Sequence, residues 1–151
     1  MEFRFPLMRD KNRRLMEFLE WKKDYELGLE QIDLQHKNLV AILNQLYDFT
    51  SRDTSIPKQE IQEVLISLTN YVVYHFDTEE DLMERYKYPA SVGHRNQHES
   101  FKNTVTDFLE KYDRNELNPI EIAEFLKHWL LNHIAKEDTA LVPYLKSKGV
   151  M

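Results

Sequence analysis

Histidines and a carboxylate recur at four-residue steps within one short stretch of the chain, YHFDTEEDLMERYKYPASVGHRNQHESF, residues 74–101. His75 and Glu79 form one such pair, and His94 and His98 form another. On an α-helix a step of four residues is a rotation of about 400° and a rise of about 6 Å, so the members of each pair point the same way. Neutral imidazole and ionised carboxylate are natural ligands of transition metals. The two pairs therefore predict metal binding, provided that the helices bearing them lie side by side.

Four stretches of the chain repeat apolar residues at alternating steps of three and four, which is typical of a helix with one buried face. The stretches are residues 32–46, 61–86, 94–112 and 122–133. Short connections between consecutive helices favour antiparallel neighbours. We therefore predict an all-α fold, an up-down-up-down four-helix bundle with an N-terminal arm and a short C-terminal tail around residues 139–145.

Proline and capping residues mark the expected helix boundaries. Ser55 is a possible N-cap of the second helix, with Pro57 in its first turn. Asn118 can cap the fourth helix, with Pro119 at its first position. Pro89 separates the second helix from the third, because the residue before a proline is pushed out of the helical conformation.

The bundle topology brings the polar residues of the buried faces to one end. His36 lies near the start of the first helix and His133 near the end of the fourth, while residues 75–79 end the second helix and residues 94–98 open the third. In an up-down-up-down bundle these four places share an end. Unpaired buried imidazoles and carboxylates each cost several kcal/mol, whereas a metal satisfies them. The spacing thus favours a metal ligand set of His36, His75, Glu79, His94, His98 and His133.

Asp138 is harder to place from spacing. It follows His133 by five residues, which on a regular helix is a rotation of about 140° away from that histidine. It joins the cluster only if the helix ends or distorts between the two residues. Five histidines and two carboxylates exceed one tetrahedral zinc and suit two metals bridged by the carboxylates.

Each of these histidines taken alone has an ordinary explanation, namely a hydrogen-bonded residue of the core. Only the joint pattern on four helices favours a metal. His128 lies beside Trp129, off the buried face, and we interpret it as partly solvated and not a ligand. Glu80, Asp81 and Glu84 are interpreted as a solvated face of the second helix.

The composition narrows the class of protein. The chain has 151 residues, which fits one domain, and its net charge of −6 argues against a nucleic-acid partner. The lack of cysteine excludes disulfides, thiolate metal sites and thiol catalysis, and agrees with a reducing compartment. No apolar run approaches a membrane span, and the N-terminus lacks the apolar block of a signal peptide. We expect a soluble, cytoplasmic protein without stable membrane insertion.

The segments EWKKDYELGLEQIDLQHKNLVAILNQLYD, HFDTEEDLM, HRNQHESF and WLLNHIAKED resemble the hemerythrins, in particular the bacterial ones. The combined motif H…HxxxE…HxxxH…HxxxxD is specific, although each part is weak. The similarity covers roughly residues 18–145. We therefore expect a hemerythrin-like four-helix-bundle domain over residues 18–151 and an N-terminal extension over residues 1–17.

The resemblance implies reversible O₂ binding at a non-haem di-iron centre, for oxygen storage, delivery or sensing. The implied ligands are His94, His98 and His133 for one iron, His36 and His75 for the other, and Glu79, Asp138 and an oxo or hydroxo group as bridges. Counting these ligands leaves a free position on the iron bound by His36 and His75, where O₂ would bind. By position, the candidate walls of the O₂ pocket are Leu39, Phe76, Trp129, Leu130 and Ile134.

Two other functions stay open at this point. One is a di-iron enzyme, such as a peroxidase, an oxidase or a nitric-oxide-handling protein. Such oxidases favour paired Glu-x-x-His motifs, which this sequence lacks, so we expect an oxygen-binding protein with at most a weak peroxidase-like side activity. The other is a helical interaction module with a structural zinc. The sequence does not identify an oxygen-using enzyme or a signalling partner that would receive the O₂.

Overall fold

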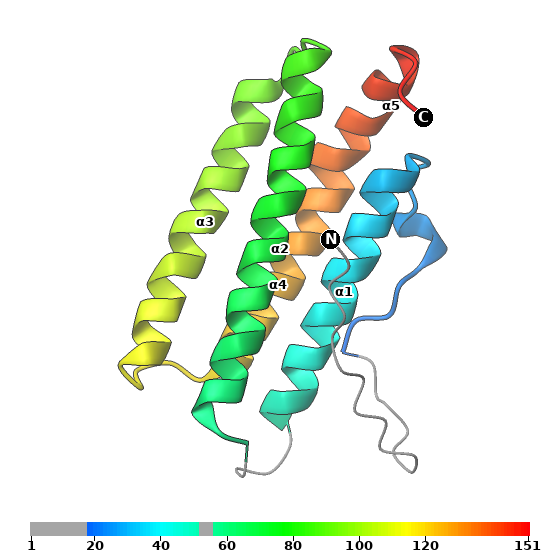
Figure 1. Ribbon diagram of the computed structural model, residues 1–151. Helices are drawn as coiled ribbons and strands as arrows, with labels where there is room; N and C mark the ends of the chain where they lie inside the picture. The colour runs from blue at the N-terminus through cyan, green and yellow to red at the C-terminus, as the bar shows by residue number, and fades with distance from the viewer. Residues whose placement is uncertain (1–17, 52–55) are drawn as a thin grey trace.

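The computed structural model describes residues 18–51 and 56–151, and within these ranges the chain forms helices and no strands. The long helices of the chain run side by side along the molecule (Figure 1). Residues 1–17, the expected extension, and Ser55, the expected cap, lie outside the described residues. The all-α bundle prediction is confirmed by α1 (Glu30–Ser51), α2 (Lys58–Arg85), α3 (Ser91–Asp113) and α4 (Pro119–His133).

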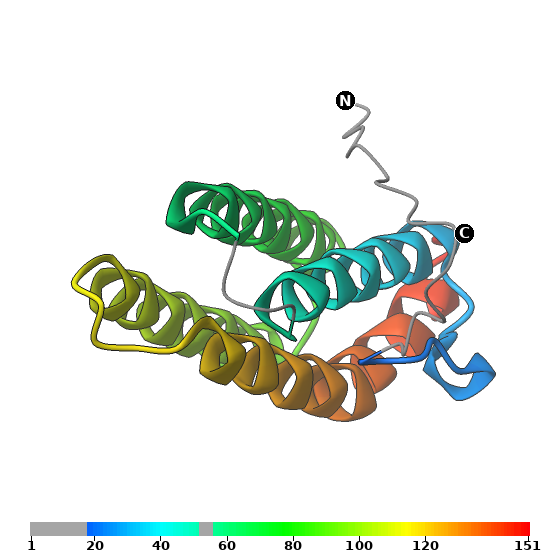
Figure 2. The same ribbon diagram turned by 90° about the horizontal axis from the view of Figure 1, so that it is seen from below.

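The order of the helices around the bundle matches the predicted topology. Helix α1 contacts α2 and α4, and α3 contacts the same two helices, as the view from below in Figure 2 shows. The chain direction alternates from each helix to the next. The starts of α1 and α3 and the ends of α2 and α4 therefore lie at one end of the bundle, the upper end in Figure 1.

The helix boundaries follow local chemistry. Asn118 Oδ1 accepts a hydrogen bond from the Ile120 N–H at 3.0 Å, while the Asn118 N–H donates to Glu121 Oε2 at 3.2 Å. Pro119 occupies the first position of α4, as predicted. Pro57 is the residue immediately before α2 and does not lie in its first turn. Between α2 and α3 the chain is non-helical around Pro89, again as predicted.

The expected C-terminal tail is helical. After α4 the backbone continues through a π-helical segment, η2 (Ile134–Asp138), into α5 (Thr139–Ser147). In α5 the side chains of Leu141, Val142 and Leu145 are fully buried. This helix is therefore part of the hydrophobic core at the upper end of the bundle.

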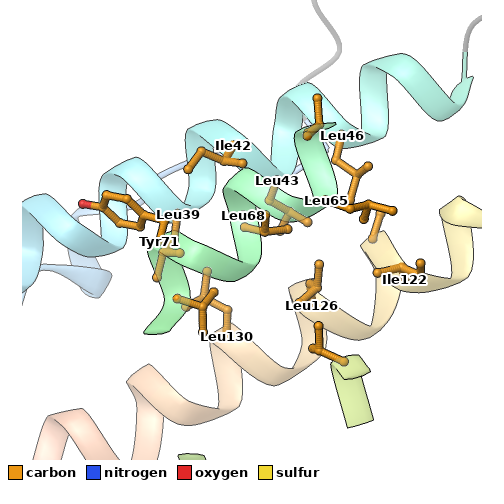
Figure 3. Packing of buried hydrophobic residues seen from close by; sticks show 14 of the residues in the cluster. Leu39, Ile42, Leu43, Leu46, Leu65, Leu68, Tyr71, Ile122, Leu126 and Leu130 are labelled. Atoms are coloured by element: carbon orange, nitrogen blue, oxygen red, sulfur yellow. The ribbon is translucent and has the colours of Figure 1, made fainter. Parts of the chain in front are cut away.

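Two clusters of buried apolar residues fill the bundle. The larger one spans most of its length, and Figure 3 shows Leu39 and Leu43 of α1, Leu68 of α2 and Leu130 of α4 among its members. A smaller cluster at the upper end combines α5 with Leu29, Ile32, Leu82 and Met83. Burial of each large apolar side chain stabilises the fold by about 1.5–3 kcal/mol.

The stretch before α1 is held against the bundle by specific contacts. The Phe18 ring stacks on Tyr47, with ring centroids 4.0 Å apart. At Gly28 the chain turns with a φ of 89°, and the buried Asp33 carboxylate accepts the N–H groups of Leu27 and Gly28 at 2.8 and 3.0 Å. A short 3₁₀ turn, η1 (Lys23–Tyr25), lies within this stretch.

In the part of the chain that the structure describes, no helix is both long and apolar enough to cross a membrane.

Candidate metal centre

All seven predicted ligand residues are buried and lie at the upper end of the bundle. None exposes more than 3% of its surface. Helix α1 supplies one residue, α2 two, α3 two, the last residue of α4 one, and the end of η2 one. In this order they are His36, His75, Glu79, His94, His98, His133 and Asp138.

The ligand atoms form two groups, each able to hold one metal ion. In one group, Glu79 meets His94, His98 and His133. In the other, Glu79 and Asp138 meet His36 and His75. In each group the ligand atoms lie within 4.8 Å of one another. Among the described residues these are the only such groups of at least three histidine or acidic residues.

The Glu79 carboxylate lies between the two groups and turns one oxygen to each. Its Oε1 is 3.0 Å from His75 Nε2, and its Oε2 is 3.0 Å from both His94 Nε2 and His98 Nε2. The same oxygen lies 3.5 Å from His133 Nε2. A carboxylate in this position can bridge two metals.

Asp138 divides its oxygens in the same way. Its Oδ2 is 2.9 Å from His36 Nε2, whereas its Oδ1 is 3.1 Å from His133 Nε2 and 3.4 Å from His94 Nε2. The π-helical segment explains how a residue five positions after His133 reaches the same face. A π-helix pairs residues i and i+5, so residues five apart lie over one another. The distortion that the spacing required is therefore present.

The arrangement fits metal ions better than hydrogen bonds. The Nε2 atoms of His36 and His75 lie 3.2 Å apart, as do those of His98 and His133. Facing imidazole lone pairs repel unless a proton or a cation lies between them. Three of the four carboxylate oxygens, Glu79 Oε1 and both oxygens of Asp138, also lack any hydrogen bond although imidazole nitrogens are close. Ligand atoms about 3 Å apart suit a metal with bonds of about 2.1 Å to each.

Electrostatics within the cluster of these seven buried residues, which we call the cage, keep both acids ionised. Burial raises the pKa of Glu79, but His75 and the other imidazoles outweigh it and hold the pKa well below its usual value. Burial and the charge of Glu79 raise the pKa of Asp138. His133 and His36 lower it by a larger amount, so the pKa lies below its usual value. Burial lowers the pKa of His133, and Asp138 and Glu79 then raise it to about 10. A bound metal would take the place of the proton on His133.

Comparison with known proteins decides the family. The sequence matches the family model described as the hemerythrin HHE cation binding domain over residues 27–145. The bacteriohemerythrin of Stenotrophomonas maltophilia is 32% identical, with 87% of this chain and 84% of that protein covered. The bacteriohemerythrin of Pseudomonas aeruginosa is 34% identical, with 84% and 81% covered. A crystal structure of wild-type hemerythrin is 28% identical, with a TM-score of 0.77 and coverage of 85% of this chain and 98% of that one.

The chain belongs to the hemerythrin family. Its function is the binding of oxygen by non-haem iron, and its cofactor is the di-iron centre of hemerythrins. Both the resemblance and the function that it implied are therefore confirmed.

As expected of a hemerythrin, apolar side chains surround the buried polar groups. The Phe76 ring stacks on His98 at a centroid distance of 3.8 Å, and Trp129 stacks on His133 at 4.4 Å. Beside them lies an apolar cavity of about 20 Å³. Of the five predicted pocket walls, Leu39, Phe76, Trp129 and Leu130 line this cavity. Ile134 is buried in the same core cluster but does not line it.

The cage lies between the two apolar clusters. Along α1, His36 separates Ile32 of the smaller cluster from Leu39 of the larger one. Along η2 and α5, Asp138 separates Ile134 of the larger cluster from Leu141 of the smaller one. The polar groups are thus sealed from water above and below by packed side chains.

Hydrogen bonds behind the histidines were not anticipated from the sequence. Glu80, interpreted as part of a solvated face, has a side chain only 27% exposed and accepts a hydrogen bond from His98 Nδ1 at 2.8 Å. Gln35 Oε1 accepts from His75 Nδ1 at 2.7 Å. Only the register between neighbouring helices reveals these pairs, so single-helix spacing could not find them.

His128 is exposed, as predicted.

Proposed function

We propose that His94, His98 and His133 hold one iron and that His36 and His75 hold the other. In the same proposal Glu79 and Asp138 would each bind both irons, and an oxo or hydroxo group would complete the centre. The observation that supports this assignment best is that each carboxylate directs one oxygen to each histidine group.

When bound, two irons supply the electrons needed to hold O₂ reversibly. The chain's own residues would then bind, orient and shield. The hydrogen bonds of His75 and His98 leave a proton on each Nδ1, so that each Nε2 keeps its lone pair free for the metal. The residues that line the cavity beside Phe76 are all hydrophobic, which favours a small apolar ligand over water.

We also propose that this protein stores, delivers or senses O₂ and does not turn over a substrate. The residues that line the cavity beside the centre are hydrophobic, and none of them is an acid or a base that could move a proton to a substrate. Steady consumption of hydrogen peroxide or nitric oxide, faster than the iron oxidises in air, would contradict this.

A cytoplasmic location is proposed from the cysteine-free composition.

The test of the ligand assignment is the iron content of three purified variants, His98→Ala, Glu79→Ala and the control His128→Ala. The control removes an exposed histidine of α4 and should keep two irons per chain. The two ligand variants should lose iron, and a normal iron content in both would refute the assignment.

The test of oxygen binding is an optical spectrum of the reduced protein before and after exposure to air. A visible band that appears with O₂ and disappears under vacuum supports reversible binding. A colourless protein that is isolated with zinc and does not exchange it for iron would favour the structural alternative.

A further inference from the structure

Two histidines of the cage differ in the group that accepts their outer proton. His98 Nδ1 faces the carboxylate oxygen Oε1 of Glu80 at 2.8 Å. His75 Nδ1 faces the amide oxygen Oε1 of Gln35 at 2.7 Å. The two contacts are alike in length, but one acceptor has a negative charge and the other is neutral.

The orientation of the Gln35 amide is fixed by its second contact. Its Nε2 donates to Thr78 Oγ1 at 3.1 Å, which leaves only the oxygen to face His75. Thr78 Oγ1 in turn donates to the backbone carbonyl of Tyr74 at 3.0 Å. The neutral acceptor behind His75 is therefore held in place by a chain of three hydrogen bonds.

The remaining histidines strengthen the difference between the two halves. His133 Nδ1 has a second carboxylate nearby, with Glu137 Oε2 at 3.8 Å. The Nδ1 atoms of His36 and His94 are buried and have no hydrogen-bond partner among the described residues. The three-histidine group therefore has two carboxylates behind it, and the two-histidine group has none.

A charged acceptor changes what an imidazole does as a ligand. Hydrogen bonds to ionised groups are about twice as strong as those between neutral groups. A carboxylate that draws on the Nδ1 proton makes the opposite nitrogen, Nε2, more basic. A more basic ligand binds the higher oxidation state of iron in preference to the lower one.

We propose that Glu80 and Gln35 are positioning residues that make the two halves of the centre unequal. Glu80 strengthens His98 as a donor and stabilises ferric iron in the three-histidine half. Gln35 orients His75 without adding charge and leaves the two-histidine half weaker as a donor, so that reduced iron there resists oxidation. This inference rests on the proposed ligand assignment.

The test exchanges the two acceptors, in Glu80→Gln and Gln35→Glu, and measures the midpoint potential of the iron-loaded protein. Removing such a contact changes metal affinity about 10–100-fold. If the affinity for ferric iron alone changes tenfold, the midpoint potential shifts by about 59 mV for one electron. The potential should rise in Glu80→Gln and fall in Gln35→Glu.

The matched control is Glu84→Gln. Glu84 lies one turn after Glu80 on α2 and is 83% exposed, with Arg95 at 3.8 Å as its partner. The substitution removes the same charge without touching an imidazole, so its potential should stay at the wild-type value. Affinity for Zn²⁺, measured by titration of the metal-free proteins, gives a second readout that involves neither redox nor oxygen. It should fall in Glu80→Gln and rise in Gln35→Glu.

Shifts of opposite sign in the two exchange variants support the proposal, because damage to packing would move both variants in one direction. Shifts of the same sign, or potentials equal to the Glu84→Gln control, overturn it while leaving the ligand assignment intact. If Glu80→Gln does not fold, the sign of the shift in Gln35→Glu decides alone. A wild-type protein that binds fewer than two irons overturns the ligand assignment, and this inference with it.

Discussion

Deletion of Lys136 tests whether the π-helical segment is what brings Asp138 to the centre. Asp138 Oδ1 lies 3.1 Å from Nε2 of His133, five residues earlier. After the deletion the aspartate would follow His133 by four residues, a rotation of about 400° and a rise of about 6 Å on a regular α-helix. The carboxylate would then point about 40° away from the histidine, on the same face. We expect this variant to fold, to lose no more than about 2 kcal/mol of unfolding free energy, and to keep two irons.

Insertion of one alanine after Lys136 should have the opposite result. Each additional residue turns the helix that follows by about 100°. The turn would move the aspartate away from the cage and swing Leu141, Val142 and Leu145, all fully buried, out of the smaller apolar cluster. Three such side chains contribute about 5 kcal/mol or more. This loss is comparable with the whole stability of a domain, about 5–15 kcal/mol.

Iron content after anaerobic reconstitution and urea unfolding of the metal-free proteins measure both effects. Lys136→Ala is the control, because Lys136 is exposed and its substitution leaves the chain length unchanged. A deletion variant as unstable as the insertion variant would refute the reasoning. So would a deletion variant that is folded but without iron, because Asp138 would then depend on the five-residue spacing itself.

Three further outcomes are expected. Phe76→Ala should lower the unfolding free energy in urea by about 3–5 kcal/mol, because this ring is only 1% exposed, and an unchanged midpoint would argue against tight packing there. Metal uptake at pH 8 should release about one proton per chain from His133, because burial lowers its pKa but Asp138 and Glu79 raise it to about 10. An indicator titration should show this release vanish above pH 10, and the metal-free fold should lose stability as the pH rises from about 6.5 towards 10. Asn118→Ala should cost about 1 kcal/mol in thermal unfolding, because α4 loses its cap, whereas an unaltered Tm would show the cap to be dispensable.

The convergence of the histidines could be predicted because helical period and bundle topology together determine where a residue lies. His36, near the start of one helix, and His133, near the end of another, are 97 residues apart in the sequence, yet both belong to the same cage. The argument needs only the face of each helix and the direction of the chain. Both follow from the three-and-four spacing and from the short connections.

Other parts of the site could not be predicted because they depend on details between helices. The π-helical turn before Asp138 has no known signal in the spacing, which by itself placed this residue on the wrong face. The partners Gln35 and Glu80 depend on the register of α2 against α1 and α3. An exposed acid and one that accepts a hydrogen bond from a buried histidine look the same in sequence, as Glu84 and Glu80 show.

The position of the cage makes the metal part of the hydrophobic core. All four long helices and η2 contribute at least one residue to the two groups that could hold metal, so separating any of them from the bundle would break up the cluster. Without metal, the interior must hold two ionised carboxylates with three oxygens that lack hydrogen bonds, and a proton on His133 offsets one of the two negative charges. Bound metal would neutralise the carboxylates and satisfy their unpaired oxygens. Because the unfolded chain has no such site, the free energy of metal binding adds to the free energy of folding. At a free metal concentration of 100 times Kd this gain is about 2.7 kcal/mol, which is as much as one more fully buried leucine provides.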